Sequence, residues 1–243
     1  MRIAVVADIH GNLPALESVL ADLRKTSPDL VVHGGDVASH GSSPAEVIDL
    51  IRELDWPGVR GNTDEMLWNS AQRFDMDNWP SELHGLRDRL FNDIAPATVD
   101  AIGSERLGWL RGLPVVWSGH DLRVVHATPG DLWRAPKPDA EHGEFVDTYG
   151  GLGSRWVVYG HLHRPFVRRF GSLTVANAGS VGLPYDGDSR ASYALVDERL
   201  SEVTVRRVAY DVRREVGLLK SRQRPHADWL GEILLHAKYV PVR

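Results

Sequence analysis

The sequence predicts an α/β protein, and three observations support this fold class. The first sixty residues alternate short apolar runs with segments of helical periodicity, in the order strand, helix, strand, helix, strand. This order predicts a parallel sheet with right-handed crossovers. Helical patterns dominate residues 65–112, and short β-type runs dominate from residue 113 onward. We therefore expect a single domain over 1–243 that contains a helical insertion at 65–112.

The opening segment is predicted to hold three strands and two helices. Residues 2–7 form an apolar run typical of a buried strand, and 30–33 and 58–60 are expected as further short strands. Asn12 is a suitable N-cap for the first helix. The apolar stripe of that helix consists of Leu13, Leu16, Val19, Leu20 and Leu23. The stretch 43–46, Ser-Pro-Ala-Glu, predicts a capping box with proline at the first helical position of the second helix.

The rest of the chain is predicted to supply helices, then hairpins, then a final helix. Two helices of the insertion are indicated by two stripes, Leu83, Leu86, Leu90 and Ile94, then Val99, Ile102, Leu107 and Leu110. Three hairpins are expected, 114–117 with 122–126 about a turn at 118–121, 167–170 with 173–176, and 192–196 with 203–208. A buried strand is expected at 156–159. The last helix carries Trp229, Leu230, Ile233 and Leu234.

Composition excludes several classes of site and partner. The 243 residues carry a net charge of −5 and include no cysteine, which excludes disulfides, zinc–thiolate clusters and cysteine nucleophiles. No apolar run approaches the roughly 20 residues that span a bilayer, and no signal-peptide pattern is present. We therefore expect no membrane partner and a cytoplasmic location. The acidic balance disfavours nucleic acid. It is compatible with a small phosphorylated substrate, because bound cations would add positive charge.

Polar residues that bind metals follow five of the expected strands. They are Asp8, His10, Asp36, Asn62, His126, His161 and His163. Glycines precede three of these positions, and glycine lets the backbone turn sharply and approach a ligand closely. Carboxylates, imidazoles and an amide oxygen suit Mn, Fe, Co or Zn better than Ca. Seven ligands are too many for one tetrahedral ion and fit two ions that share a carboxylate.

The order of these residues is D-x-H, G-D, G-N, H and G-H-x-H, and it resembles the pattern of the calcineurin-like metallophosphoesterases. The resemblance covers nearly the whole chain. It looks closest to the small prokaryotic phosphodiesterases, to which the stretch 177–184 is also similar. The family implies a four-layer α/β/β/α sandwich of two facing mixed sheets.

The same resemblance implies how the ligands divide. One ion would be held by Asp8, His10 and His163, a second by Asn62, His126 and His161, with Asp36 bridging the two. The ions implied are Mn, Fe, Zn, Co or Ni, and Mg is also compatible. Two ions about 3.5–4 Å apart lower the pKa of a bridging water, and the resulting hydroxide attacks phosphorus in line with the leaving oxygen. We therefore expect a two-metal phosphodiesterase in which Asp36 and Asn62 take part in catalysis.

One position departs from many family members. They carry a histidine directly after the asparagine, where this chain has Thr63, and threonine does not act as an acid near neutral pH. The small prokaryotic phosphodiesterases also lack this histidine. The departure implies activated leaving groups or an acid from elsewhere. His40, four residues beyond Asp36, is a candidate, and its alternative interpretation is a histidine in a surface loop.

Other functions and roles stay open at this point. One alternative is a noncatalytic metal-binding scaffold, but such proteins have usually lost ligands, and all seven are present here. A nuclease would need a basic groove, which the net charge of −5 does not support. A phosphomonoesterase or protein phosphatase is a further alternative. His33 is expected to be buried beneath the site. Arg134, Lys137 and Arg164 either hold substrate phosphate or are solvated. The tryptophans near the insertion either pack in the core or stack on a nucleobase. The substrate, the native metals and the formation of a homo-oligomer are left undecided.

Overall fold

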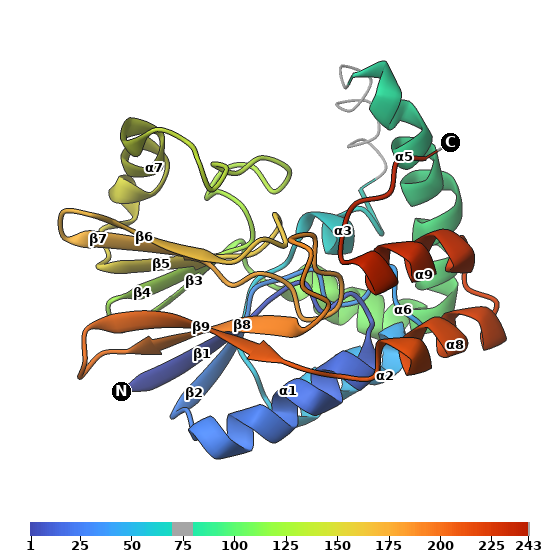
Figure 1. The fold of residues 1–243 in the computed structure, drawn as a ribbon, viewed down its shortest axis with the longest axis horizontal. Helices are drawn as coiled ribbons and strands as arrows, with labels where there is room; N and C mark the ends of the chain where they lie inside the picture. Colours follow the sequence, from blue (N-terminus) through green and yellow to red (C-terminus); the bar gives the residue numbers. More distant parts are fainter. Residues whose placement is uncertain (70–79, 243) are drawn as a thin grey trace.

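Two mixed β-sheets face each other in the computed structural model, which describes residues 1–69 and 80–242 (Figure 1). The first sheet has the order β2-β1-β8-β9, with β2 at Leu30–His33, β1 at Arg2–Val6, β8 at Ala191–Asp197 and β9 at Glu202–Val208. The second has the order β3-β4-β5-β7-β6. Its strands are β3 (Val116–Gly119), β4 (Leu122–Val125), β5 (Trp156–Tyr159), β7 (Leu173–Asn177) and β6 (Phe166–Phe170).

Helices cover the outer face of each sheet. On the first sheet lie α1 (Leu13–Thr26) and α2 (Pro44–Glu53), and the C-terminal helices α8 (Val212–Ser221) and α9 (Ala227–His236) pack beside them (Figure 1). On the second sheet lie α7 (His142–Tyr149) and the short η4 (Gly150–Leu152). The four-layer arrangement with two mixed sheets is therefore confirmed.

The side chains of β1 point alternately to the two faces of the sheet, so that one strand packs into two hydrophobic cores. Ile3 and Val5 lie in the apolar layer between the sheets, together with Val124 and Val158 of the second sheet. Ala4 and Val6 point to the other face and pack against the helices. Because successive side chains of a strand point to opposite faces, a strand covered on both faces reads as a continuous apolar run. This is the run that predicted the strand.

The helical segment continues from residue 81 to residue 112. It consists of η2 (Ser81–Leu83), α5 (His84–Asp88), η3 (Arg89–Ile94, a π-helix) and α6 (Ala95–Gly112). The two helices expected here join directly, and the break within the segment lies at Gly103, where φ is 72°. The single domain and the insertion at 65–112 stay predictions, and residues 70–79 of that range lie outside the described residues.

Three local predictions are wrong. The first concerns residues 58–60, which form no strand, since Gly58 makes only a single bridge to His33. Pairing stops there because Pro57 has no N–H and because Arg60 N donates to Pro114 O at 3.0 Å. The parallel sheet expected from the first sixty residues is thus limited to β1 and β2, and antiparallel β8 lies on the other side of β1.

The other two corrections concern a cap and a turn. The N-cap of α2 is Ser43, but its side chain caps no backbone N–H and lies 3.0 Å from Ser42 Oγ. The first hairpin pairs Gly119 with Leu122, so its turn shrinks to residues 120 and 121. The Asn12 cap is confirmed, since Asn12 Oδ1 accepts from Ala15 N at 3.1 Å. None of the helices in residues 1–69 and 80–242 has the length and apolar character needed to cross a membrane.

Candidate metal centre

The loops that follow four strands bring the predicted ligand residues to one place. The first sheet contributes Asp8, His10 and Asp36, the second contributes His126, His161 and His163, and α3 (Asn62–Glu65) begins at Asn62. Six of the seven side chains are buried, and His161 is partly exposed. Residues that lie far apart in the sequence therefore meet between the ends of the two sheets.

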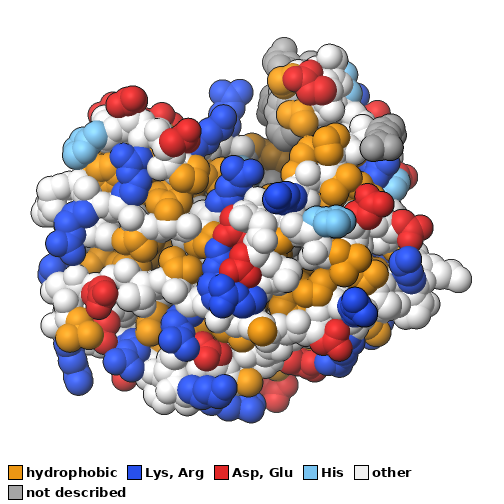
Figure 2. Space-filling view, in the orientation of Figure 1, with side chains coloured by type: hydrophobic (Ala, Val, Ile, Leu, Met, Phe, Trp, Pro, Cys, Tyr) orange, Lys and Arg blue, Asp and Glu red, His pale blue; other side chains and the backbone are white. Residues whose placement is uncertain are grey.

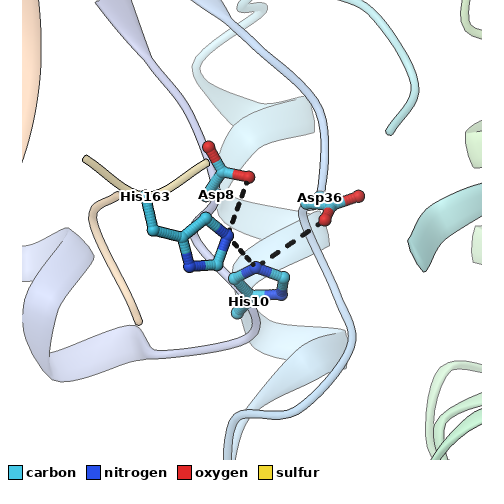
Figure 3. Close-up of side chains that lie close together, drawn as sticks. All are labelled: Asp8, His10, Asp36 and His163. Carbon is cyan, nitrogen blue, oxygen red and sulfur yellow. Dashed lines mark hydrogen bonds and ion pairs between the residues drawn. The ribbon is translucent and has the colours of Figure 1, made fainter. Parts of the chain in front are cut away.

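The first group consists of Asp8, His10, Asp36 and His163, whose side chains point toward one another (Figure 3). His163 Nε2 lies 3.2 Å from Asp8 Oδ1 and 3.1 Å from His10 Nε2. His10 Nε2 lies 3.7 Å from Asp36 Oδ2. One ligand atom from each of the four residues lies within 4.8 Å of the others, a spacing suited to a shared metal ion.

The second group lies on the other side of Asp36. Asn62 Oδ1 is 2.7 Å from His126 Nε2 and 3.1 Å from His161 Nδ1. His126 Nε2 is 3.6 Å from Asp36 Oδ1, the oxygen that does not face His10. The two oxygens of Asp36 are therefore directed to two separate groups of nitrogen and oxygen atoms.

Each histidine of the centre has one ring nitrogen next to a backbone carbonyl. The pairs are His10 Nδ1 with Ser39 O (3.2 Å), His126 Nδ1 with Gly34 O (2.9 Å), His161 Nε2 with Trp133 O (2.9 Å), and His163 Nδ1 with Leu183 O. Because a carbonyl only accepts, the nitrogen beside it carries the proton in the neutral ring. The other nitrogen then keeps its lone pair and faces the centre, as a metal ligand requires.

The backbone of these loops adopts a conformation that is rare for residues other than glycine. The φ angles of Asp8, His10, Asp36, His161 and His163 lie between 50° and 64°. Such left-handed residues cost energy and persist where the surroundings hold them. Here His10 N donates to Asp36 O at 2.9 Å, and His161 N donates to the Asp8 carboxylate at 3.0 Å. Hydrogen bonds between the loops thus offset the strain.

Two glycines allow the loops to approach so closely. A Cβ on Gly61 would stand 2.0 Å from Asp36 Oδ1, and a Cβ on Gly160 would stand 2.2 Å from Asp8 Oδ2. The carboxylates would have to move, and for Gly61 the backbone N of Asp36 would also stand 2.4 Å from the Cβ. The glycines before Asn62 and His161 are therefore explained by contact with the carboxylates.

Two residues hold the loops in place: Asp64, to which sequence reasoning gave no role, and Ser180, which lies in the stretch 177–184 that the resemblance singled out. The buried Asp64 accepts from Val37 N at 2.9 Å and from Gly61 N at 3.0 Å, so it ties the loop of Asp36 to the start of α3. Ser180 Oγ donates to Asp8 O at 2.7 Å and accepts from Leu183 N at 2.7 Å. The signal for Asp64 is its place at the third position of a short helix, where aspartate satisfies free backbone N–H groups.

Burial governs the electrostatics of the centre. It raises the pKa of Asp36 to about 7, lowers the pKa of His161 to about 3, and holds the pKa of His10 well below its usual value. His10 and His161 are thereby kept neutral, which is the form that binds metal, whereas at His126 burial is outweighed by the nearby Asp36 and Asp8 carboxylates, which raise its pKa. The buried carboxylates of Asp8 and Asp36 call for positive charge. The donor set therefore fits divalent cations.

The other singled-out residues take different positions. His40 is buried, and its ring lies 4.8 Å from that of His10; burial lowers the pKa of His40 to about 4. Thr63 N donates to Asp36 Oδ1 at 2.9 Å. His33 is buried as expected, with its ring 5.8 Å from Trp109. Within the described residues the tryptophans near the insertion pack against the core or against His33, and Trp79 lies outside those residues.

A cavity of about 200 Å³ adjoins the metal centre. Its floor includes His10, Asp36 and Asn62, and its walls come from the helical segment, from loops that carry Trp133, Leu183 and Tyr185, and from the C-terminal region. In the orientation of Figure 1, the surface is hollowed between the region of α7 and the region of α5 (Figure 2). On the same face Lys and Arg side chains are interspersed with Asp and Glu. Arg134 and Lys137 lie exposed beside His161, and Arg164 is also exposed.

Comparisons with known proteins agree with this geometry. An uncharacterized protein of Methanocaldococcus jannaschii is 31% identical, with 96% of each chain covered. The phosphodiesterase YfcE of Escherichia coli is 25% identical over 84% of this chain and 91% of its own length. The crystal structure of a metallophosphoesterase from Sphaerobacter thermophilus has a TM-score of 0.79 and 26% identity, and covers 98% of this chain and 99% of its own.

A second solved structure agrees on the fold, and a family model identifies the family. A hypothetical protein from Pyrococcus horikoshii shares the fold, with a TM-score of 0.82 at 20% identity over 98% of this chain and 99% of its own. The family model of the calcineurin-like phosphoesterase superfamily domain matches residues 1–200. The chain belongs to the calcineurin-like phosphoesterase superfamily and is a metal-dependent phosphoesterase.

Proposed function

We propose that this protein is a two-metal phosphodiesterase. Asp8, His10 and His163 would hold one divalent ion, Asn62, His126 and His161 the other, and Asp36 would lie between them. The observation that carries this proposal is the position of Asp36. Its Oδ2 lies 3.7 Å from His10 Nε2 and its Oδ1 lies 3.6 Å from His126 Nε2, so one carboxylate reaches both groups.

The chemistry divides between the ions and the chain. Divalent ions bound here would supply an activated water at neutral pH and positive charge for the phosphoryl oxygens. The chain orients four imidazoles through backbone carbonyls and shields the centre from bulk water. Nitrogen and oxygen donors favour Mn, Fe, Co, Zn or Ni, with Mg also compatible. A role for His40 as the acid stays a prediction.

The lining of the adjoining cavity favours a diester over a monoester, while Arg134 and Lys137 belong to a separate pocket beside His161. No Lys or Arg stands among the described residues that line the adjoining cavity. A monoester carries a second negative charge that would need further cations, whereas the second arm of a diester is an uncharged group suited to an apolar wall. The relative from Escherichia coli is also named as a phosphodiesterase.

The test is a metal titration combined with an assay. Metal-free protein is titrated with Mn²⁺ by calorimetry, and hydrolysis of bis(p-nitrophenyl) phosphate is followed in parallel. We expect two equivalents to bind and hydrolysis to require both. Asp36→Asn should lose one equivalent and lower kcat by at least a hundredfold, while Asp228→Asn, at an exposed carboxylate, serves as the control. Binding of a single equivalent by the wild type, or normal turnover by Asp36→Asn, would reject the proposal.

A further inference from the structure

The cavity beside the metal centre has walls of an unusual kind for a phosphate-binding protein. Apart from the candidate ligands, its walls are mostly aromatic or aliphatic, namely Leu86, Leu90, Trp133, Leu183, Tyr185, Trp229 and Tyr239. No Lys, Arg or Glu occurs among the described lining residues. A group that occupies this space is therefore uncharged, and aromatic walls favour a planar ring, because rings stack at little entropic cost.

Two of the aromatic walls are held rigidly. Trp229 Nε1 donates to Val240 O at 2.8 Å, and the Arg89 guanidinium lies 5.1 Å from the centre of the Trp229 ring. Tyr185 stacks on His163 with ring centres 4.6 Å apart and an interplanar angle of 19°. The walls are thus preorganised to receive a ring, which reduces the entropy lost on binding.

Three residues that line the cavity also carry a buried polar atom without a hydrogen-bond partner among the described residues. The atoms are His40 Nδ1, Thr63 Oγ1 and Tyr239 Oη. Buried polar groups normally find a partner, and those that do not are candidates for ligand contacts. A purely hydrocarbon group would leave all three unsatisfied. A heterocycle with donors and acceptors on its edge offers partners that a hydrocarbon lacks.

The walls come from parts of the chain outside the ligand motifs. Leu86 and Leu90 lie in the helical segment, and Trp229 and Tyr239 lie beyond residue 200, where the match to the family model ends. The ligand motifs supply the reaction, whereas these wall residues contact the rest of the bound molecule. Selectivity is therefore expected to reside in this cavity.

We infer that the cavity binds a nucleobase, so that the substrate is a nucleoside phosphodiester with a single phosphate at the metal centre. This inference rests on the proposed function and adds the class of substrate. A nucleobase is planar and uncharged, and it has polar edges for His40, Thr63 and Tyr239. Stacking of a base on aromatic side chains contributes to binding largely irrespective of which base it is.

The experiment compares two inhibitors that differ by the base alone. Adenosine 5′-monophosphate and ribose 5-phosphate are tested against hydrolysis of bis(p-nitrophenyl) phosphate by the Mn²⁺-loaded protein. We expect the nucleotide to have a Ki at least tenfold lower. Leu86→Trp, which fills the cavity, should bring the two Ki values within twofold, and Tyr239→Phe should reduce their ratio three- to tenfold. Leu235→Trp, at an exposed leucine of α9 that does not line the cavity, is the matched control.

The outcomes separate this inference from the proposed function. Equal Ki values for the two inhibitors in a protein that hydrolyses the diester would overturn the inference and leave the phosphodiesterase intact. If no hydrolysis occurs with any metal, the proposed function fails, and binding is then read from quenching of tryptophan fluorescence by adenosine 5′-monophosphate. Quenching that Leu86→Trp abolishes and Leu235→Trp retains would support the base site. Absence of quenching in the wild type would overturn it.

Discussion

His33 provides a quantitative test of how a buried histidine couples stability to pH. Its side chain is fully buried, and neither ring nitrogen has a hydrogen-bond partner among the described residues. Burial alone lowers the pKa of His33 from 6.5 to about 4. Each pKa unit is worth about 1.36 kcal/mol, so the full coupling is about 3.4 kcal/mol.

The sign of the effect follows from which state binds the proton. Between pH 6.5 and about 4 the unfolded chain protonates His33 and the folded chain does not, so the free energy of unfolding falls as the pH falls. The loss attributable to His33 is about 2 kcal/mol at pH 5 relative to pH 7.5. His33→Leu removes this pH-dependent contribution. Any effect of the substitution on packing is the same at every pH and does not alter the comparison.

The assay is urea unfolding of the metal-free protein at several values of pH between 7.5 and 4.5. The wild type should lose about 2 kcal/mol more than His33→Leu between pH 7.5 and pH 5. His236→Gln, at an exposed histidine near the end of α9, should follow the wild type at every pH. If the difference between His33→Leu and the wild type is the same at all values of pH, His33 is not held neutral and the reasoning fails.

Two further predictions concern the loops of the metal centre. Gly61→Ala should abolish tight Mn²⁺ binding measured by calorimetry, because its Cβ would stand 2.0 Å from Asp36 Oδ1; Gly108→Ala, where a Cβ meets nothing within 4 Å, should bind Mn²⁺ normally. Normal Mn²⁺ affinity in Gly61→Ala would contradict the close packing of the loop on Asp36. Asp64→Ala should weaken Mn²⁺ binding about 10- to 100-fold and lower the free energy of unfolding by about 1–3 kcal/mol, since Val37 N and Gly61 N lose their acceptor. Unchanged values of both quantities would show that Asp64 does not hold the loops.

The fold was predictable where the pattern is local. The continuous apolar run of β1 indicated a strand buried on both faces, and Asn12 indicated the start of α1. Residues 58–60 carry the same kind of local signal but do not extend the sheet. A strand exists through its partner: Gly58 lies against His33 of β2, but Arg60 N donates to Pro114 O, far along the chain. Pairing of this kind is decided by the whole chain.

The site was predictable to a similar extent. The order of the motifs indicated the seven candidate ligands, and the structure brings them together. Asp64 was missed because its bond to Val37 joins segments 27 residues apart, and only its bond to Gly61, three residues earlier, has a local signal. The cavity was missed because its walls combine Leu86, Trp133 and Trp229, which have no common pattern along the sequence.

The sequence by itself therefore determined the class of fold and the residues available as ligands, since these depend on residue type and short spacing, and the resemblance of its ordered motifs to the calcineurin-like metallophosphoesterases indicated the type of reaction. The tertiary structure alone decided which nitrogen of each histidine faces the centre, that the two oxygens of Asp36 point to separate groups, and that an uncharged aromatic cavity adjoins them. These features depend on contacts between distant segments. Their geometry follows from the packing of two sheets and of the helices that cover them.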